Sequence, residues 1–180
     1  DPGFHPFVHR SLGSAVRDIV ASAAEHAASD WADRVTWDGR IFLLGYSEGG
    51  YATMVGARAL QDAPVTGGTL VTAIPCAGPY DLSGTMIPRI LEGVTEPSPY
   101  YVPYMIFAYN AVYGPSVSTF AADLVFKDPY KTTLPQLFDG THGSVEINAA
   151  MPEGGIPKGA LTPEAIADLE YSTSDLYKTL

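Results

Sequence analysis

Ten consecutive residues carry the strongest structural signal in this sequence: Ile41-Phe42-Leu43-Leu44-Gly45-Tyr46-Ser47-Glu48-Gly49-Gly50. The first four are continuously apolar, which is typical of a strand buried on both faces of a parallel sheet. The part that follows matches the pattern Gly-x-Ser-x-Gly. An alanine-rich segment from Tyr51 to Ala63 then predicts a helix. The stretch therefore predicts a strand, a sharp turn and a helix, with Ser47 on the turn.

A serine in this position has a specific chemical use. At a sharp turn between a strand and a helix, its hydroxyl projects above the edge of the sheet. Small residues two positions before and two positions after it, here Gly45 and Gly49, let the turn close. The backbone N–H of Glu48 can then point at a developing oxyanion, beside the positive end of the helix. The alternative is a glycine-rich turn with a purely structural role.

The flanking residues extend the pattern into an alternation of helices and strands. Apolar residues recur at helical spacing from Arg10 to Ser29, which predicts an amphipathic helix. A second apolar run from Thr69 to Ile74 predicts another buried strand. The order helix, strand, helix, strand predicts an α/β fold with a parallel sheet.

The second half of the chain has a different character. Prolines and aromatic residues fill the stretch from Gly93 to Phe126, where the charged residues are Glu96 and Asp123. We expect short helices, one of them at about 103–112, and another starting at Thr162-Pro163-Glu164. The aromatic side chains form either a hydrophobic core or the underside of an apolar lid, and the two interpretations are compatible.

Composition restricts the classes of function. The 180 residues are 46% hydrophobic and 17% charged, which favours a globular fold and excludes a disordered chain. A net charge of -10 argues against a nucleic-acid partner. No apolar stretch reaches the length of about 18 residues that a membrane-spanning helix needs. The single cysteine, Cys76, reads as a small core residue, and the four histidines lack metal-ligand spacing, so we expect no metal and no cofactor.

The residues from Ile41 to Ala52 resemble the nucleophile elbow of the bacterial secreted lipases and esterases of the α/β-hydrolase family. Residues 77–82 resemble the end of that family's next strand, and residues 1–7 resemble the loop after its fourth strand. The resemblance covers most of residues 1–150. It implies an α/β-hydrolase core with a helical cap, a serine esterase or lipase activity, and an extracellular or periplasmic location. We accordingly expect residues 1–82 to form a core segment with the nucleophile elbow and residues 83–180 to form the cap or lid region.

The resemblance also implies a catalytic acid and a histidine that follow the serine along the chain. No strong strand pattern after Ile74 would position them, so we expect a fragment that lacks the first strands and the Asp/His end. The missing remainder of the hydrolase would then be its partner. His142 is a weaker candidate for the base within the chain, although its glycine-rich surroundings favour a surface loop. Its acid would be one of four residues: Asp81, Asp123, Asp128 and Asp139.

The remaining histidines have structural interpretations. His5 precedes a proline in a loop, where a turn or packing role is favoured over a place at the mouth of the site. His9 and His26 are expected at the start and on the surface of the first helix.

The predicted reaction is hydrolysis of a small or lipid-like carboxylic ester through an acyl-enzyme on Ser47, with the Glu48 backbone N–H in the oxyanion hole. Two alternatives stay open. A serine peptidase of the prolyl-oligopeptidase type shares the elbow and would cleave peptide amides. A catalytically incomplete α/β-hydrolase-like binding module would lack an imidazole within hydrogen-bond reach of the serine hydroxyl.

Overall fold

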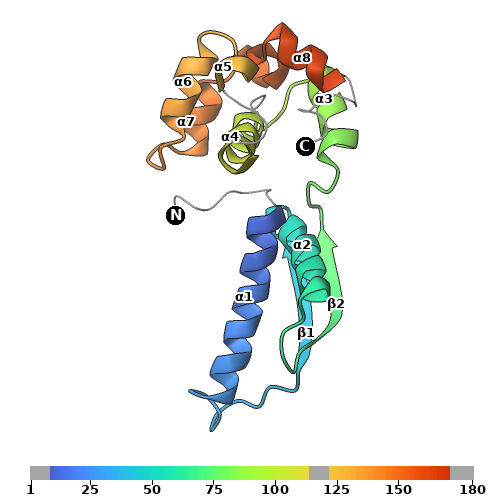
Figure 1. Cartoon of the computed structure of the whole chain (residues 1–180). Helices are drawn as coiled ribbons and strands as arrows, with labels where there is room; N and C mark the ends of the chain where they lie inside the picture. Colours follow the sequence, from blue (N-terminus) through green and yellow to red (C-terminus); the bar gives the residue numbers. More distant parts are fainter. Residues whose placement is uncertain (1–8, 114–121, 171–180) are drawn as a thin grey trace. The chain divides into compact units, whose positions relative to one another are not determined.

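The computed structural model describes residues 9–113 and 122–170, which belong to two compact units, Asp1–Tyr80 and Asp81–Leu180 (Figure 1). The first unit contains two helices and two strands, and the described part of the second is helical. Across the described residues, no helix is both long and apolar enough to cross a membrane.

The first unit alternates helices and strands as predicted. The four elements are α1 (His9–Ala28), β1 (Arg40–Tyr46), α2 (Glu48–Asp62) and β2 (Thr69–Cys76). The strands pair in parallel, from Arg40 opposite Thr69 to Tyr46 opposite Cys76. The predicted parallel α/β arrangement is confirmed, and the described residues contribute two strands to the sheet.

The helices pack closely on each other and on the sheet. Figure 1 shows α1 and α2 running alongside β1 and β2. A Cβ atom on Gly56 of α2 would overlap the side chain of Val16 on α1, so this glycine allows the close approach. A buried apolar cluster forms where the helices meet the sheet, and its members are Ala24, Ile41, Leu60 and Val65.

The prediction that β1 is buried on both faces is wrong for the described chain. Ile41 lies in the core, but Phe42, Leu44 and Tyr46 are exposed. Successive side chains of a strand point to opposite faces. The helices α1 and α2 cover the face that carries Ile41, and no described element of this unit covers the other.

The second unit is built from short helices, as predicted. They are a π-helical turn η1 (Leu82–Met86), α3 (Ile87–Leu91), α4 (Tyr101–Tyr113), α5 (Ala122–Val125), α6 (Tyr130–Leu137), α7 (Ser144–Ala149), the 3-10 turns η3 (Glu153–Gly155) and η4 (Pro157–Ala160), and α8 (Pro163–Glu170).

The aromatic and apolar residues of α4 contribute to the core of this unit. Met105, Ile106 and Tyr109 are buried. The ring of Phe107 packs edge-on against Phe126 and Phe138, with centroids 5.7 and 5.1 Å away. The core interpretation of the aromatic stretch is therefore confirmed for the described residues, while the lid interpretation stays a prediction.

Candidate active site

Ser47 lies on the turn between β1 and α2, in a backbone conformation that L-residues rarely adopt. Its φ is 56° and its ψ is -122°. Its N–H donates a hydrogen bond of 2.9 Å to the Cys76 carbonyl, which ties the turn to the end of β2. The residue is exposed. Non-glycine residues in such regions cost about 1–3 kcal/mol and persist where the surroundings hold them in place. The sequence thus folds into a strained turn on which Ser47 is exposed to solvent.

Two glycines make the tight turn possible. A Cβ atom on Gly45 would overlap the Gly49 carbonyl and come within 2.5 Å of the Thr53 hydroxyl. A Cβ atom on Gly50 would overlap the Cys76 carbonyl. By contrast, a Cβ atom on Gly49 would contact nothing in the described part of the chain. The predicted need for a small residue two positions after the serine is therefore wrong there, and the next glycine meets it instead.

Glu48 offers two different groups beside the serine. Its backbone N–H belongs to the first residue of α2, where no preceding helical turn supplies an acceptor. This is the amide that the sequence predicts for the oxyanion hole. The side chain is partly buried, and its Oε1 has no hydrogen-bond partner among the described residues. Burial raises the pKa of the Glu48 carboxyl.

Sequence reasoning missed two residues around the turn. Thr53 is a buried polar residue of α2, and its hydroxyl occupies the space that a side chain on Gly45 would need. The available signal was its position four residues after Gly49, on the same face of the helix. Ala77, just after β2, has a positive φ of 49°. No sequence pattern indicates that conformation, since alanine normally avoids it.

His26 is the histidine of the first unit whose side chain the structure describes, and it lies at the other end of the sheet from Ser47. His26 is in the last turn of α1, which leads toward the start of β1, whereas Ser47 follows the end of β1. The His26 Nδ1 is 2.7 Å from Asp30 Oδ2 in an exposed pair. His9 begins α1, and His5 lies outside the described residues.

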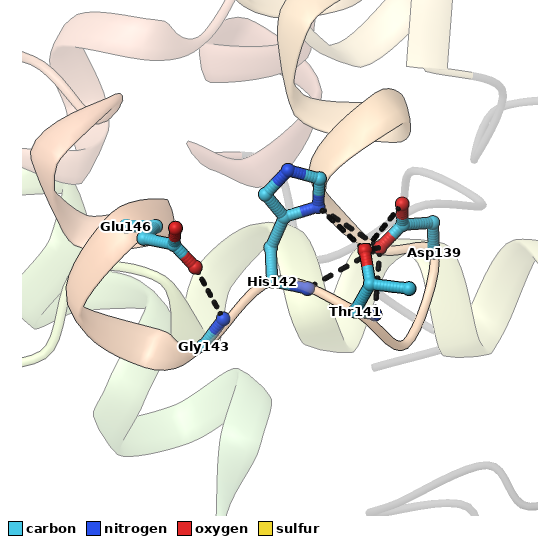
Figure 2. A network of polar contacts seen from close by, with 5 residues as sticks. All are labelled: Asp139, Thr141, His142, Gly143 and Glu146. Atoms are coloured by element: carbon cyan, nitrogen blue, oxygen red, sulfur yellow. Dashed lines mark hydrogen bonds and ion pairs between the residues drawn. The ribbon is translucent and has the colours of Figure 1, made fainter.

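His142 and Asp139 form a pair in the second unit. The His142 Nδ1 is 2.9 Å from Asp139 Oδ1, and Asp139 also accepts hydrogen bonds from the N–H and hydroxyl of Thr141 (Figure 2). The Thr141 backbone and the His142 ring hold the pKa of Asp139 well below its usual range. In turn, the hydrogen bond to Asp139 raises the pKa of His142. The pair lies in the turn before α7, where Gly143 N–H donates to Glu146.

Of the four candidate acids, Asp139 is the one that contacts His142 in the described part of the chain. Asp81 accepts hydrogen bonds from the Gly84 N–H and the Thr85 hydroxyl at the start of η1. Asp128 pairs with Lys131 at 2.9 Å. Asp123 is exposed on α5. A turn role accounts for Asp81, as the sequence predicts for residues of this type.

This chain is similar in structure to known proteins. No protein-family model matches the chain, and no curated protein sequence does either. A solved structure of a candidate hydrolase from Legionella pneumophila matches with a TM-score of 0.73 and 27% identity, over 97% of this chain and 44% of that one. The rice cell wall degrading esterase LipA from Xanthomonas oryzae, solved with a ligand, matches with a TM-score of 0.70 and 21% identity, over 99% of this chain and 47% of LipA.

These matches establish a mixed α/β fold like that of hydrolase structures, with a parallel sheet and helices. The chain spans less than half the length of each protein that it matches.

Strain at Ser47 gives a first prediction. We expect the Ser47→Gly variant to be more stable than Ser47→Ala by about 1 kcal/mol, because glycine adopts this backbone conformation without steric cost. Both variants lose the hydroxyl, so the comparison isolates the backbone. Urea denaturation measures the difference.

The matched control is Ser14, an exposed serine within α1. There the order should reverse, with glycine about 1 kcal/mol less stable than alanine, because the backbone is helical. Equal stability of the two Ser47 variants would show that the turn stores no strain.

The His142 pair gives a second prediction. A titration followed by nuclear magnetic resonance should place the pKa of His142 above its ordinary value of 6.5. The Asp139→Asn variant should lower it, and Glu146→Gln should lower it less, because Asp139 supplies the hydrogen bond. Since the folded-state pKa is raised, the pair stabilises the unit fully below the ordinary pKa, and this stabilisation is lost as pH rises through the raised value. An unchanged titration in Asp139→Asn would contradict the assignment.

Proposed function

We propose that this chain carries the nucleophile of a serine hydrolase that cleaves carboxylic esters. The observation that carries the proposal is the backbone of Ser47, which is held at φ 56° and ψ -122° between a strand and a helix. Strain of this kind concentrates at functional sites, and the nucleophile elbow of serine hydrolases likewise carries its serine on a strained turn between a strand and a helix. The likeness to an esterase and to a candidate hydrolase supports the same reaction class.

The elbow accounts for the first step of the proposed reaction. The Ser47 Oγ attacks the ester carbonyl carbon while its proton passes to an imidazole base. The oxygen of the tetrahedral intermediate then accepts hydrogen bonds from backbone N–H groups, among them that of Glu48. Collapse of the intermediate breaks the bond to the alcohol, which takes the proton from the imidazolium. Water attacks the acyl-enzyme by the same sequence and releases the acid.

We assign the base and its orienting acid to polypeptide outside residues 1–180. Within the first unit, the described imidazole is paired with Asp30 at the end of the sheet remote from Ser47. The alternative within the chain is His142, whose Nδ1 is held by Asp139 in the manner of an oriented general base.

The proposed substrate is a small or lipid-like ester, and the proposed location is extracellular or periplasmic. LipA, one of the matching structures, is an esterase that degrades rice cell wall. The net charge of -10 disfavours polyanionic substrates. No step of the proposed mechanism requires a metal or a cofactor.

The proposal is tested with the protein produced from its complete reading frame. We expect hydrolysis of p-nitrophenyl butyrate, and a fall in kcat of about 10⁴-fold or more in Ser47→Ala, because the nucleophile is lost. The control variant Ser14→Ala removes another exposed serine hydroxyl of the first unit and should leave kcat unchanged. Ester assays with both variants provide the measurement.

Three other outcomes would redirect the assignment. Faster cleavage of a peptidyl p-nitroanilide than of the ester would favour the peptidase alternative. Absence of both activities in a folded protein would favour the incomplete binding module. Retained activity in His142→Ala is expected, and its loss would move the base into this chain.

A further inference from the structure

The chain makes a second strained turn directly after β2. Ala77 has a φ of 49°, in the left-handed region that alanine normally avoids. The peptide unit that joins Cys76 to Ala77 carries the carbonyl that accepts the Ser47 N–H at 2.9 Å. Rotation about the N–Cα bond of Ala77 sets the orientation of this peptide unit relative to the residues that follow. The two strained residues are therefore linked by one hydrogen bond, and the segment after Ala77 helps to fix its acceptor.

The side chain of Tyr80 packs where this segment meets α2. A Cβ atom on Gly78 would come within 2.7 Å of the Tyr80 ring and within 2.6 Å of the Tyr51 nitrogen. A Cβ atom on Gly50 would come within 2.8 Å of the Tyr80 hydroxyl. The tyrosine thus fills space that two glycines leave open, between the segment after β2 and the first turn of α2.

Backbone hydrogen bonds connect the same places. The Tyr80 N–H donates to the Gly78 carbonyl at 3.0 Å, which closes a tight turn over three residues. The Tyr51 N–H donates to the Ser47 carbonyl at 3.2 Å, at the start of α2. The packing of Tyr80 against α2 therefore joins the segment after β2 to the backbone of Ser47 by a second route, beside the Cys76 carbonyl.

We propose that Tyr80 is a positioning residue for Ser47, because its ring holds the segment after β2 against α2 and so keeps the Cys76 carbonyl on the Ser47 N–H. A backbone in a rare conformation persists only where its surroundings restrain it. Loss of the ring should let the turn at Ala77 relax and weaken this hydrogen bond. The consequence for ester hydrolysis rests on the proposed function of Ser47, whereas the packing of the turn does not.

Amide hydrogen exchange in the protein produced from its complete reading frame tests the packing. We expect the Ser47 amide to exchange at least about tenfold faster in Tyr80→Ala than in the parent, because its acceptor is no longer held. The matched control is the Thr69 amide, which donates to the Gly39 carbonyl at 2.7 Å at the other end of the same sheet and should not change. Tyr80→Phe should behave like the parent, because its ring still fills the space beside Gly78.

Ester hydrolysis tests the catalytic consequence. With p-nitrophenyl butyrate, Tyr80→Ala should lower kcat by about 10- to 100-fold and leave KM within about twofold, because a small displacement of a nucleophile slows the reaction without weakening substrate binding. Tyr80→Phe should keep kcat within about threefold of the parent. The control Trp31→Ala removes a ring of similar exposure, 49% against 44% for Tyr80, near the start of β1, and should leave both constants unchanged.

Other results would overturn the positioning role. An unchanged Ser47 amide in Tyr80→Ala would show that the ring does not hold the turn. Equal acceleration at Thr69 would show a general loosening of the sheet instead. Faster exchange at Ser47 with an unchanged kcat would show that catalysis does not need this hydrogen bond. A loss of kcat in Tyr80→Phe as large as in Tyr80→Ala would assign the effect to the hydroxyl.

Two further provisions keep the test decisive. Should Tyr80→Ala fail to fold, Tyr80→Leu retains an apolar side chain, lacks the reach of the ring to Gly50 and should give the same results. A folded parent protein without ester hydrolysis would contradict the proposed function, and exchange at Ser47 would still decide whether Tyr80 holds the turn.

Discussion

The strained turn at Ser47 is the constraint on which the rest of the first unit depends. Its backbone conformation is unfavourable for a serine, and it persists because the surrounding structure holds it. The Ser47 N–H is fixed to the Cys76 carbonyl, so β2 must end beside β1. Gly45 and Gly50 lie so close to neighbouring backbone that neither can carry a side chain. The end of β1, the start of α2 and the end of β2 therefore meet at Ser47, the proposed nucleophile.

The described residues of this unit cover only one face of the sheet. The helices α1 and α2 bury the face that carries Ile41, while Leu44 and its neighbours on the other face remain in water. An uncovered face is consistent with a chain that spans less than half the length of each matching structure. The turn thus holds the proposed nucleophile, Ser47, next to the proposed oxyanion donor, the Glu48 N–H.

Local features were predictable from the sequence, and features set by distant residues were not. The apolar run before Gly45 and the helical spacing in α1 predicted a strand and a helix, because both patterns reflect local periodicity. The same run suggested burial on both faces, since a sequence shows apolarity but not which layers are present. The steric role of Gly50 depends on a carbonyl in β2, and the pairing of His142 with Asp139 rather than with another acid depends on the shape of one turn. Such contacts are fixed by tertiary structure.

Mass spectrometry after treatment with a fluorophosphonate tests the central claim most directly, because this reagent labels serines that an adjacent base has activated. The protein should be produced from its complete reading frame, and the adduct mapped by peptide digestion. We expect one adduct, located on Ser47, that is absent from Ser47→Ala. An adduct on a different residue, or a folded protein that remains unlabelled, would contradict the assignment of Ser47 as the nucleophile.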